Sequence, residues 1–140
     1  MKKKVTVVTY DSDVAQAGRS VFVNQASSQG IGQALAKSAS DLAGGKGDIA
    51  ILSTTPDATN QNVWIDFMKK ELVAKYPDVK VVATAYGLDK PEESTTETQG
   101  LIQKNPTIKA IVAPTSVGIV AAAKYVSGSA SKGKVFVTGL

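Results

Sequence analysis

The sequence predicts one α/β domain, a three-layer α/β/α sandwich around a five-stranded and mostly parallel sheet. The chain has 140 residues, which fits a single domain of ordinary size. Short runs of β-branched residues alternate with longer amphipathic stretches, which is the pattern of repeated βα units. The predicted strands are largely continuous apolar runs, as expected where helices cover both faces of a parallel sheet. We therefore interpret residues 1–140 as one domain.

The N-terminal half predicts two strands and two helices. The first strand, 5–9, consists of valine and threonine, whose branched side chains favour an extended backbone. The first helix ends at Gly44, since glycine tolerates the left-handed cap. The second helix carries Trp64 and Leu72 on one apolar face and is closed by Pro77. In chain order we expect a strand at 5–9, an extended link at 21–25, a helix at 31–42, a strand at 49–52 and a helix at 61–75.

The C-terminal half continues the same alternation. Its clearest signal is Pro91, which suits the first turn of a helix, followed by Glu92 and Glu93 at the positive end of the helix dipole. We interpret these two acids, together with Asp89 and Lys90, as solvated charges on the surface of that helix. The elements expected here are strands at 79–84, 108–113 and 135–138, helices at 91–104 and 116–127, and a loop at 127–133.

The composition excludes several classes of function. The chain has no Cys and no His, so disulfides, zinc fingers, iron–sulfur sites and Ser-His-Asp or Cys-His catalysis are impossible. We expect no catalytic residue, no metal site and no cofactor. The net charge is +4, but the lysines at positions 2–4 account for most of it, so no nucleic-acid surface is indicated. Every apolar run is too short to cross a bilayer.

Polar residues follow three of the predicted strands. In an open parallel sheet, ligands bind outside the carboxyl ends of the strands, where loops and helix N-termini converge. Carboxylates and carboxamides can hold adjacent hydroxyl groups, and an indole covers the apolar side of a sugar ring. The set therefore suits a small polyol. The candidate binding residues are Asp11, Asp13, Asn60, Gln61, Trp64, Pro114, Thr115 and Ser116.

Each of these residues also has an ordinary structural interpretation. Asp, Asn, Ser and Thr cap helices and build turns wherever they occur. A lone tryptophan such as Trp64 is typical of a core. The functional interpretation depends on the whole set, because caps alone do not require three neighbouring loops to be so polar. Arg19 is a candidate partner of Asp11 or Asp13, with which it would order their loop.

A second class of function stays open on these observations, a free-standing flavodoxin-like or receiver-type domain. Such a domain would bind flavin or be phosphorylated on Asp11, with Asp13 completing the acidic pair that holds a magnesium ion. A receiver also needs an aspartate at the end of the third strand and a lysine at the end of the fifth. This chain has Thr84 and Thr138 at those places, which disfavours the receiver.

Four motifs in order carry a family resemblance. They are TYDSD at 9–13, VNQA at 23–26, TNQNVW at 59–64 and IVAP at 111–114. The chain resembles the sugar-binding proteins of ABC importers, of the type I periplasmic fold, and within them the rhamnose-binding and autoinducer-2-binding branch. The resemblance covers essentially the whole chain. It implies the C-terminal lobe of a protein about twice as long, in which two similar α/β lobes are joined by hinge strands.

The resemblance implies a role for each matching residue. Asp11 is similar to the carboxylate near the hinge that accepts ligand hydroxyls. Asn60 and Gln61 fall on the pair that contacts the ligand from the loop opening the second helix. Pro114 and Ser116 fall on a loop whose backbone groups face the ligand.

The same resemblance bears on the ligand. Trp64 falls on the aromatic residue of the second-helix motif. Autoinducer-2 binders carry an aspartate where this chain has Asn60, and the loss of that carboxylate favours a neutral sugar such as rhamnose.

The resemblance also implies partners and a location. The N-terminal lobe would be missing, and the full-length parent would be periplasmic, or lipid-anchored outside the cell, and deliver sugar to the membrane permease of an ABC importer. No targeting signal is evident in this chain. We expect the isolated lobe to bind sugar weakly or not at all, and to form a homodimer through its exposed cleft or sheet edge.

Overall fold

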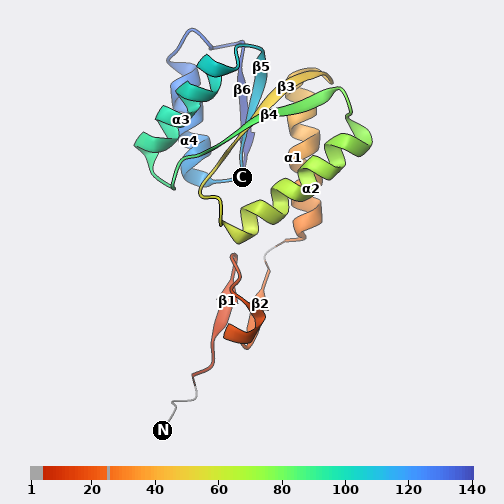
Figure 1. Ribbon diagram of the computed structural model, residues 1–140, viewed down its shortest axis with the longest axis vertical. Coiled ribbons are helices and arrows are strands. Elements are labelled where there is room, and N and C mark those ends of the chain that lie inside the picture. The colour runs from red at the N-terminus through yellow and green to blue at the C-terminus, as the bar shows by residue number, and fades with distance from the viewer. Residues whose placement is uncertain (1–4, 25) are drawn as a thin grey trace.

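A parallel sheet forms the centre of the structure, a computed structural model that describes residues 5–24 and 26–140 (Figure 1). Within those residues the main sheet has four strands in the order β4-β3-β5-β6. All of its neighbouring strands pair in parallel, so their carboxyl ends lie at one rim. The strands are β3 (Gly47–Ser53), β4 (Val79–Tyr86), β5 (Ile108–Ala113) and β6 (Phe136–Gly139).

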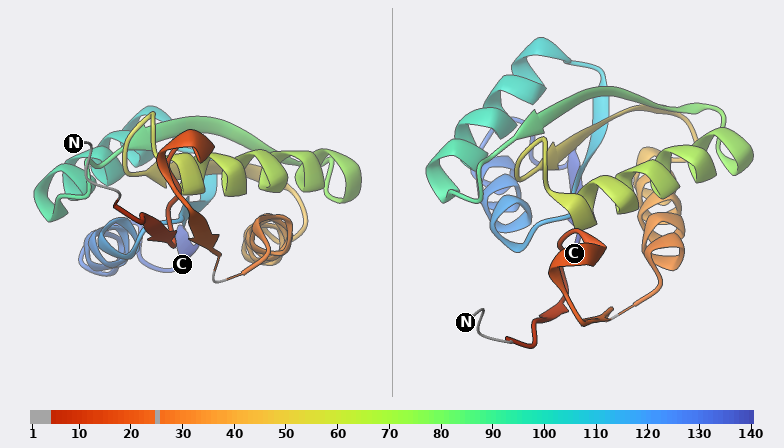
Figure 2. Two further views of the ribbon diagram at one scale, coloured as in Figure 1. Left: turned by 90° about the horizontal axis from the view of Figure 1, so that it is seen from below. Right: turned by 60° about the horizontal axis from the view of Figure 1, so that its bottom comes forward.

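Helices cover both faces of this sheet, as Figures 1 and 2 show. Helices α1 (Ser28–Ala43) and α2 (Thr59–Lys75) pack on one face, and their buried residues form one core with the sheet. Helices α3 (Pro91–Lys104) and α4 (Ser116–Ser127) enclose a second core on the other face. The predicted three-layer α/β/α architecture is therefore confirmed.

The central strand β3 serves both cores. Successive side chains of a strand point to opposite faces, so Ile49 and Ile51 lie against α1 and α2, while Ala50 and Leu52 lie on the side of α3 and α4. All four side chains are fully buried. This double burial explains why residues 49–52 of the strand are all apolar, rather than only alternate ones.

The strand count of the main sheet differs from the prediction of five. Strand β1 (Val8–Tyr10) pairs in parallel with β2 (Val21–Val23) as a separate two-stranded sheet, with a short 3₁₀ helix, η1 (Gln16–Gly18), between them. The expected link at 21–25 is thus partly strand, and residue 25 lies outside the described residues. A β-branched run specifies extended backbone, but its pairing partner is decided by the rest of the fold.

Strands β1 and β2 project from the main body below the sheet rim (Figure 1). We call residues 5–23 the arm. Much of the arm is open to solvent, since Val8 and Val21 are 57% and 50% exposed. Among the residues that the structure describes, none of the helices has both the length and the apolar character needed to span a membrane.

The packing of α1 on α2 depends on a close approach at Gly32. This buried glycine touches the backbone of α2, where an added Cβ would lie 2.8 Å from the Met68 nitrogen. Gly100 in α3 gives the contrasting case, because a Cβ there would meet nothing within 4 Å.

We expect Gly32→Ala to lower the free energy of unfolding by up to about 2 kcal/mol, because overpacking costs about 1–3 kcal/mol against the ~1 kcal/mol that alanine gains in a helix. Gly100→Ala is the matched control and should raise the free energy of unfolding by up to about 1 kcal/mol. Urea unfolding followed by circular dichroism measures both. Equal effects of the two substitutions would contradict the close approach.

Candidate functional site

A cavity of about 740 Å³ lies at the rim where the carboxyl ends of the strands meet. Its wall is built from the end of the arm strand β1 and from the loops that follow β3, β4 and β5. We call it the rim cavity. The structure brings seven of the candidate residues together here, and their part in binding stays a prediction. They are Asp11, Asn60, Gln61, Trp64, Pro114, Thr115 and Ser116.

Asp13 lies beside the rim cavity rather than on its wall. It lines a smaller cavity of about 210 Å³, which shares Asp11, Asn60 and Trp64 with the larger one. The polar groups at the end of β1 and at the start of α2 therefore surround one continuous region.

The arm is tied to helix α2 by short polar contacts. The hydroxyls of Ser12 and Thr59 lie 3.1 Å apart, and the Thr59 hydroxyl also donates to the Asp13 carbonyl at 3.3 Å. Asp11 adopts a left-handed backbone conformation, with φ of 63°, and its N–H donates to the Val23 carbonyl at 3.3 Å. These contacts place the turn after β1 at the edge of the rim cavity.

The carboxylate of Asp13 accepts hydrogen bonds from other residues of the arm. It accepts hydrogen bonds from Nε and Nη2 of Arg19 at 2.6 and 2.7 Å, from the Thr9 hydroxyl at 2.8 Å and from the Val14 N–H at 3.0 Å. The guanidinium of Arg19, which also lies over the Phe22 ring, lowers the pKa of Asp13 below its ordinary value. The structure thus pairs Arg19 with Asp13, one of its two candidate partners.

Gln61 fixes the loop after β3. Its side chain is 9% exposed, and its carbonyl oxygen accepts hydrogen bonds from the Ser53 hydroxyl at 2.8 Å and from the Thr54 N–H at 3.0 Å. Its amide nitrogen is the group left to donate toward a ligand. Asn60 has the same arrangement, because its carbonyl oxygen accepts from the Gln61 N–H at 2.8 Å. The pair therefore offers N–H donors to the rim cavity.

The loop after β5 forms another part of the wall. Pro114 is fully buried and Thr115 is 7% exposed, whereas Ser116 at the start of α4 is exposed. A Cβ at Gly118 would lie 2.6 Å from the Thr115 methyl, so the first turn of α4 packs tightly against that side chain. The Thr115 hydroxyl donates to Oδ1 of Asp89 at 3.2 Å.

Asp89 is exposed, as the sequence predicts for a solvated charge, but it does not belong to the helix that begins at Pro91. The structure places it in the loop between β4 and α3, on the wall of the rim cavity. The available signal was its position, since Asp89 follows a strand whose carboxyl end lies at the ligand-binding rim. Pro91 and the acidic residues after it predict a helix start so close to Asp89 that Asp89 was assigned to the helix.

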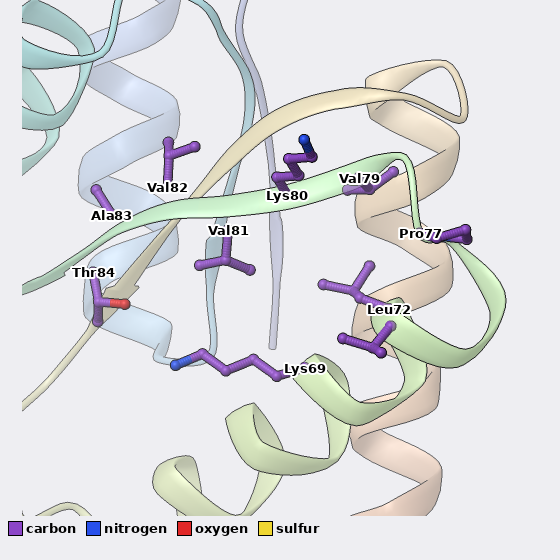
Figure 3. A pocket seen from close by; sticks show the side chains of 10 residues that line it. Lys69, Leu72, Pro77, Val79, Lys80, Val81, Val82, Ala83 and Thr84 are labelled. Carbon is purple, nitrogen blue, oxygen red and sulfur yellow. The ribbon is translucent and has the colours of Figure 1, made fainter.

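A second cavity of about 670 Å³ lies away from the rim, between α2 and the edge strand β4 (Figure 3). Figure 3 shows Lys69 and Leu72 of α2 on one side of it and Val81 of β4 on the other. Its lining is largely apolar and lacks the converging carboxylate and carboxamide groups of the rim cavity. The chemistry that suits a polyol is therefore at the rim.

Residues 1–140 match the family described as the periplasmic binding protein domain. The chain belongs to this family, whose members are non-enzymatic transport receptors, and the prediction of a protein without catalysis is thereby confirmed.

Solved structures extend the comparison. A sugar ABC transporter protein from Actinomyces odontolyticus is 47% identical with a TM-score of 0.83, covering 96% of this chain and 44% of that one. A solute-binding protein from Clostridium phytofermentas with bound L-rhamnose is 43% identical with a TM-score of 0.93, covering 96% and 42%. A third, from Burkholderia graminis with D-arabinose, is 32% identical with a TM-score of 0.85, covering 95% and 46%. The chain spans less than half the length of each.

We expect Arg19→Met to raise the pKa of Asp13 toward its ordinary value of about 3.9, because the charge-assisted hydrogen bonds are lost. In the native protein the lowered pKa means that the pair stabilises the loop above the unfolded-state pKa, and that this contribution disappears as the pH falls through the folded-state pKa. NMR titration of the aspartate carboxyl carbons measures the shift.

Lys37→Met is the control, because it removes a comparable pair with Asp41 on α1. It should leave the titration of Asp13 unchanged. An Asp13 that titrates identically in native protein and in Arg19→Met would show that the ion pair does not form in solution.

Proposed function

We propose that this chain is one lobe of a two-lobe sugar-binding protein of an ABC importer, and that it contributes half of a cleft for a rhamnose-like sugar. The observation that carries the proposal is the convergence on one rim cavity of Asp11 from the turn after β1, Asn60 and Gln61 from the first turn of α2, and Pro114 from the loop after β5.

The polar groups of the rim cavity complement a sugar. Every hydroxyl of a sugar both donates and accepts hydrogen bonds, so a binding site needs acceptors and donors side by side. Asp11 supplies carboxylate acceptors, and the amide nitrogens of Asn60 and Gln61 supply donors. Trp64 belongs to the core on the side of α1 and α2 and is 6% exposed, but it also lines both cavities at the rim, and that position supports a contact with the apolar face of a sugar ring. Asp13 then acts by positioning the turn that carries Asp11.

The proposed ligand is a neutral sugar. Asn60 stands where autoinducer-2 binders carry an aspartate, so this lobe presents an amide rather than a charge at that point. The relative from Clostridium phytofermentas, 43% identical, has bound L-rhamnose, which supports rhamnose above autoinducer-2 as the model ligand. We assign the chain to the rhamnose-binding side of that branch.

The second lobe is part of the proposal. The chain covers 42% to 46% of the three relatives described above, and in a two-lobe binder hinge closure surrounds the ligand with contacts from both sides. Half of a binding free energy of about 8 kcal/mol corresponds to millimolar affinity. The full-length parent would be periplasmic or anchored outside the cell, and would deliver sugar to a membrane permease.

The flavodoxin-like or receiver-type alternative has no comparable support. Its acidic pair would need Asp13 beside Asp11 as an ion ligand, but Arg19 already holds the carboxylate of Asp13 in an ion pair. The family match over the whole chain also favours the transport receptor.

We expect L-rhamnose to perturb the amide NMR signals of Asn60, Gln61 and Ser116 with millimolar affinity, while calorimetry at micromolar concentration shows no heat of binding. Asn60→Ala should weaken binding about three- to tenfold, the value of one hydrogen bond. Gln99→Ala, on the exposed surface of α3, is the control and should bind as the native protein does.

Micromolar affinity of the native chain would contradict the half-site. Unperturbed signals at about 100 mM rhamnose, well above a millimolar dissociation constant, would contradict the sugar site itself.

The exposed edge of the sheet supports self-association as part of this proposal. Strand β4 is an edge strand whose outer positions include Val82, 43% exposed. Such an edge can pair with the same strand of a second copy. We expect a homodimer in light scattering at high concentration, through this edge or through the exposed cleft.

Val82→Lys separates the two interfaces, because a charge on an edge strand opposes pairing. If the edge is the interface, the dimer should dissociate in Val82→Lys and persist in the control Val120→Lys, which alters an exposed valine of α4. A dimer that survives both substitutions uses the cleft, and a strict monomer of the native chain refutes self-association.

A further inference from the structure

Asp89 is held on the wall of the rim cavity by the folding of its own loop. We propose that Asp89 is a further sugar-binding residue, which accepts a hydrogen bond from a ligand hydroxyl, and that Thr115 is the positioning residue for its carboxylate. This inference depends on the sugar-binding function proposed above. It adds a specificity-determining residue on the side of the cavity formed by the ends of β4 and β5.

The loop that carries Asp89 is bound to the neighbouring site loop. The N–H groups of Gly87 and Leu88 donate to the carbonyls of Ser53 and Thr54 at 2.9 and 2.8 Å. Ser53 and Thr54 are the same residues that hold the side chain of Gln61. The loop after β4 and the loop after β3 are therefore one connected structure at the rim.

The backbone at Asp89 has an unusual conformation. Leu88 and Asp89 have φ values of 52° and 55°, in the left-handed region that residues other than glycine rarely adopt. A bulky leucine in this region is uncommon, and such outliers persist only where the surroundings determine them. The two consecutive left-handed residues turn the chain back at the rim, where Asp89 joins the wall of the cavity.

Close packing prevents the loop from relaxing away from the cavity. A Cβ at Gly87 would lie 2.9 Å from the Cα of Ser94, and Ser94 is 1% exposed at the start of α3. The Lys90 N–H donates to the Gly87 carbonyl at 2.9 Å and closes the turn. The position of Asp89 is thus determined on both sides, by the loop after β3 and by helix α3.

The carboxylate of Asp89 has one partner and capacity for more. The Thr115 hydroxyl donates to Oδ1 at 3.2 Å, and no other donor to this side chain is found within 5–24 and 26–140. None of the ion pairs in that part of the chain includes Asp89. An ionised carboxylate accepts several hydrogen bonds, so this group can accept a further hydrogen bond from a ligand hydroxyl in the cavity.

Asp89 also adds a hydrogen-bond acceptor to a site that offers amide donors. The first turn of α2 offers the amide donors of Asn60 and Gln61, and Asp89 brings a negatively charged acceptor to the same cavity. Charge-assisted hydrogen bonds are about twice as strong as neutral ones. A sugar spanning this wall would therefore be selected for a hydroxyl directed toward β4 and β5.

The test is a rhamnose titration of the whole 140-residue chain, followed by amide NMR, with Asp89→Asn as the main variant. Asparagine also tolerates the left-handed conformation and its carbonyl still accepts from Thr115, so this variant keeps the loop and removes only the charge. We expect affinity to fall about tenfold with an unchanged Tm, as a charge-assisted hydrogen bond implies. Asp66→Asn, an exposed change of the same charge on α2, should have native affinity.

A second variant tests the positioning role. Thr115→Val keeps the methyl packing over Gly118 and removes the hydroxyl that donates to Asp89. It should weaken binding less than Asp89→Asn does, and should cause no further loss when combined with it. Additive losses would overturn the assignment of Thr115 to positioning.

The outcomes separate this inference from the proposed function. Native affinity in Asp89→Asn, with normal perturbation of Asn60 and Gln61, overturns the role of Asp89 and leaves the sugar site standing. An equal loss in Asp66→Asn also overturns it, because the effect would then be one of net charge. A native chain that shows no perturbation at the rim overturns both.

Discussion

The parallel pairing of the strands is the constraint from which the site arises. Because β4, β3, β5 and β6 all run in one direction, every carboxyl end reaches the same rim, and residues far apart in the chain meet there. The helices that connect the strands bury both faces of the sheet, which explains the two separate cores on either side of β3. The two cores between the layers are therefore largely apolar, and polar residues from several loops and helix starts meet at one rim.

Many polar groups at the rim are occupied in holding the rim itself. The carbonyl oxygen of Gln61 binds the end of β3, the carboxylate of Asp13 binds Arg19, and the Thr115 hydroxyl binds Asp89. Polar residue types thus identify the region, while the hydrogen-bond partners decide which atoms remain for a ligand. The amide nitrogens of the two carboxamides are such atoms, because their oxygens are already committed. In the proposed sugar site, this preorganisation would reduce the entropy lost on binding.

Most of the fold was predictable from local patterns, and the site only in part. Uninterrupted apolar runs such as 49–52 identified buried parallel strands, and Gly44 and Pro91 marked helix ends correctly. The pairing of β1 with β2 was not predictable, because a short valine-rich run does not specify its partner. Asp89 was missed because its role depends on a left-handed turn, which the acidic helix start after it concealed. Residue type alone also could not show that Arg19 forms its ion pair with Asp13.

Asp11 lies at the end of the arm and is therefore held in place less firmly than the other residues of the rim. A two-stranded sheet is marginally stable by itself, and Tyr10 and Val23 are 78% and 54% exposed, so little burial opposes local opening of the arm. The hydrogen bond between the hydroxyls of Ser12 and Thr59 holds the arm only weakly to α2. In the proposed sugar site, apparent affinity would scale with the fraction of molecules whose arm is docked, so any covering that buries the arm would tighten binding without touching the sugar.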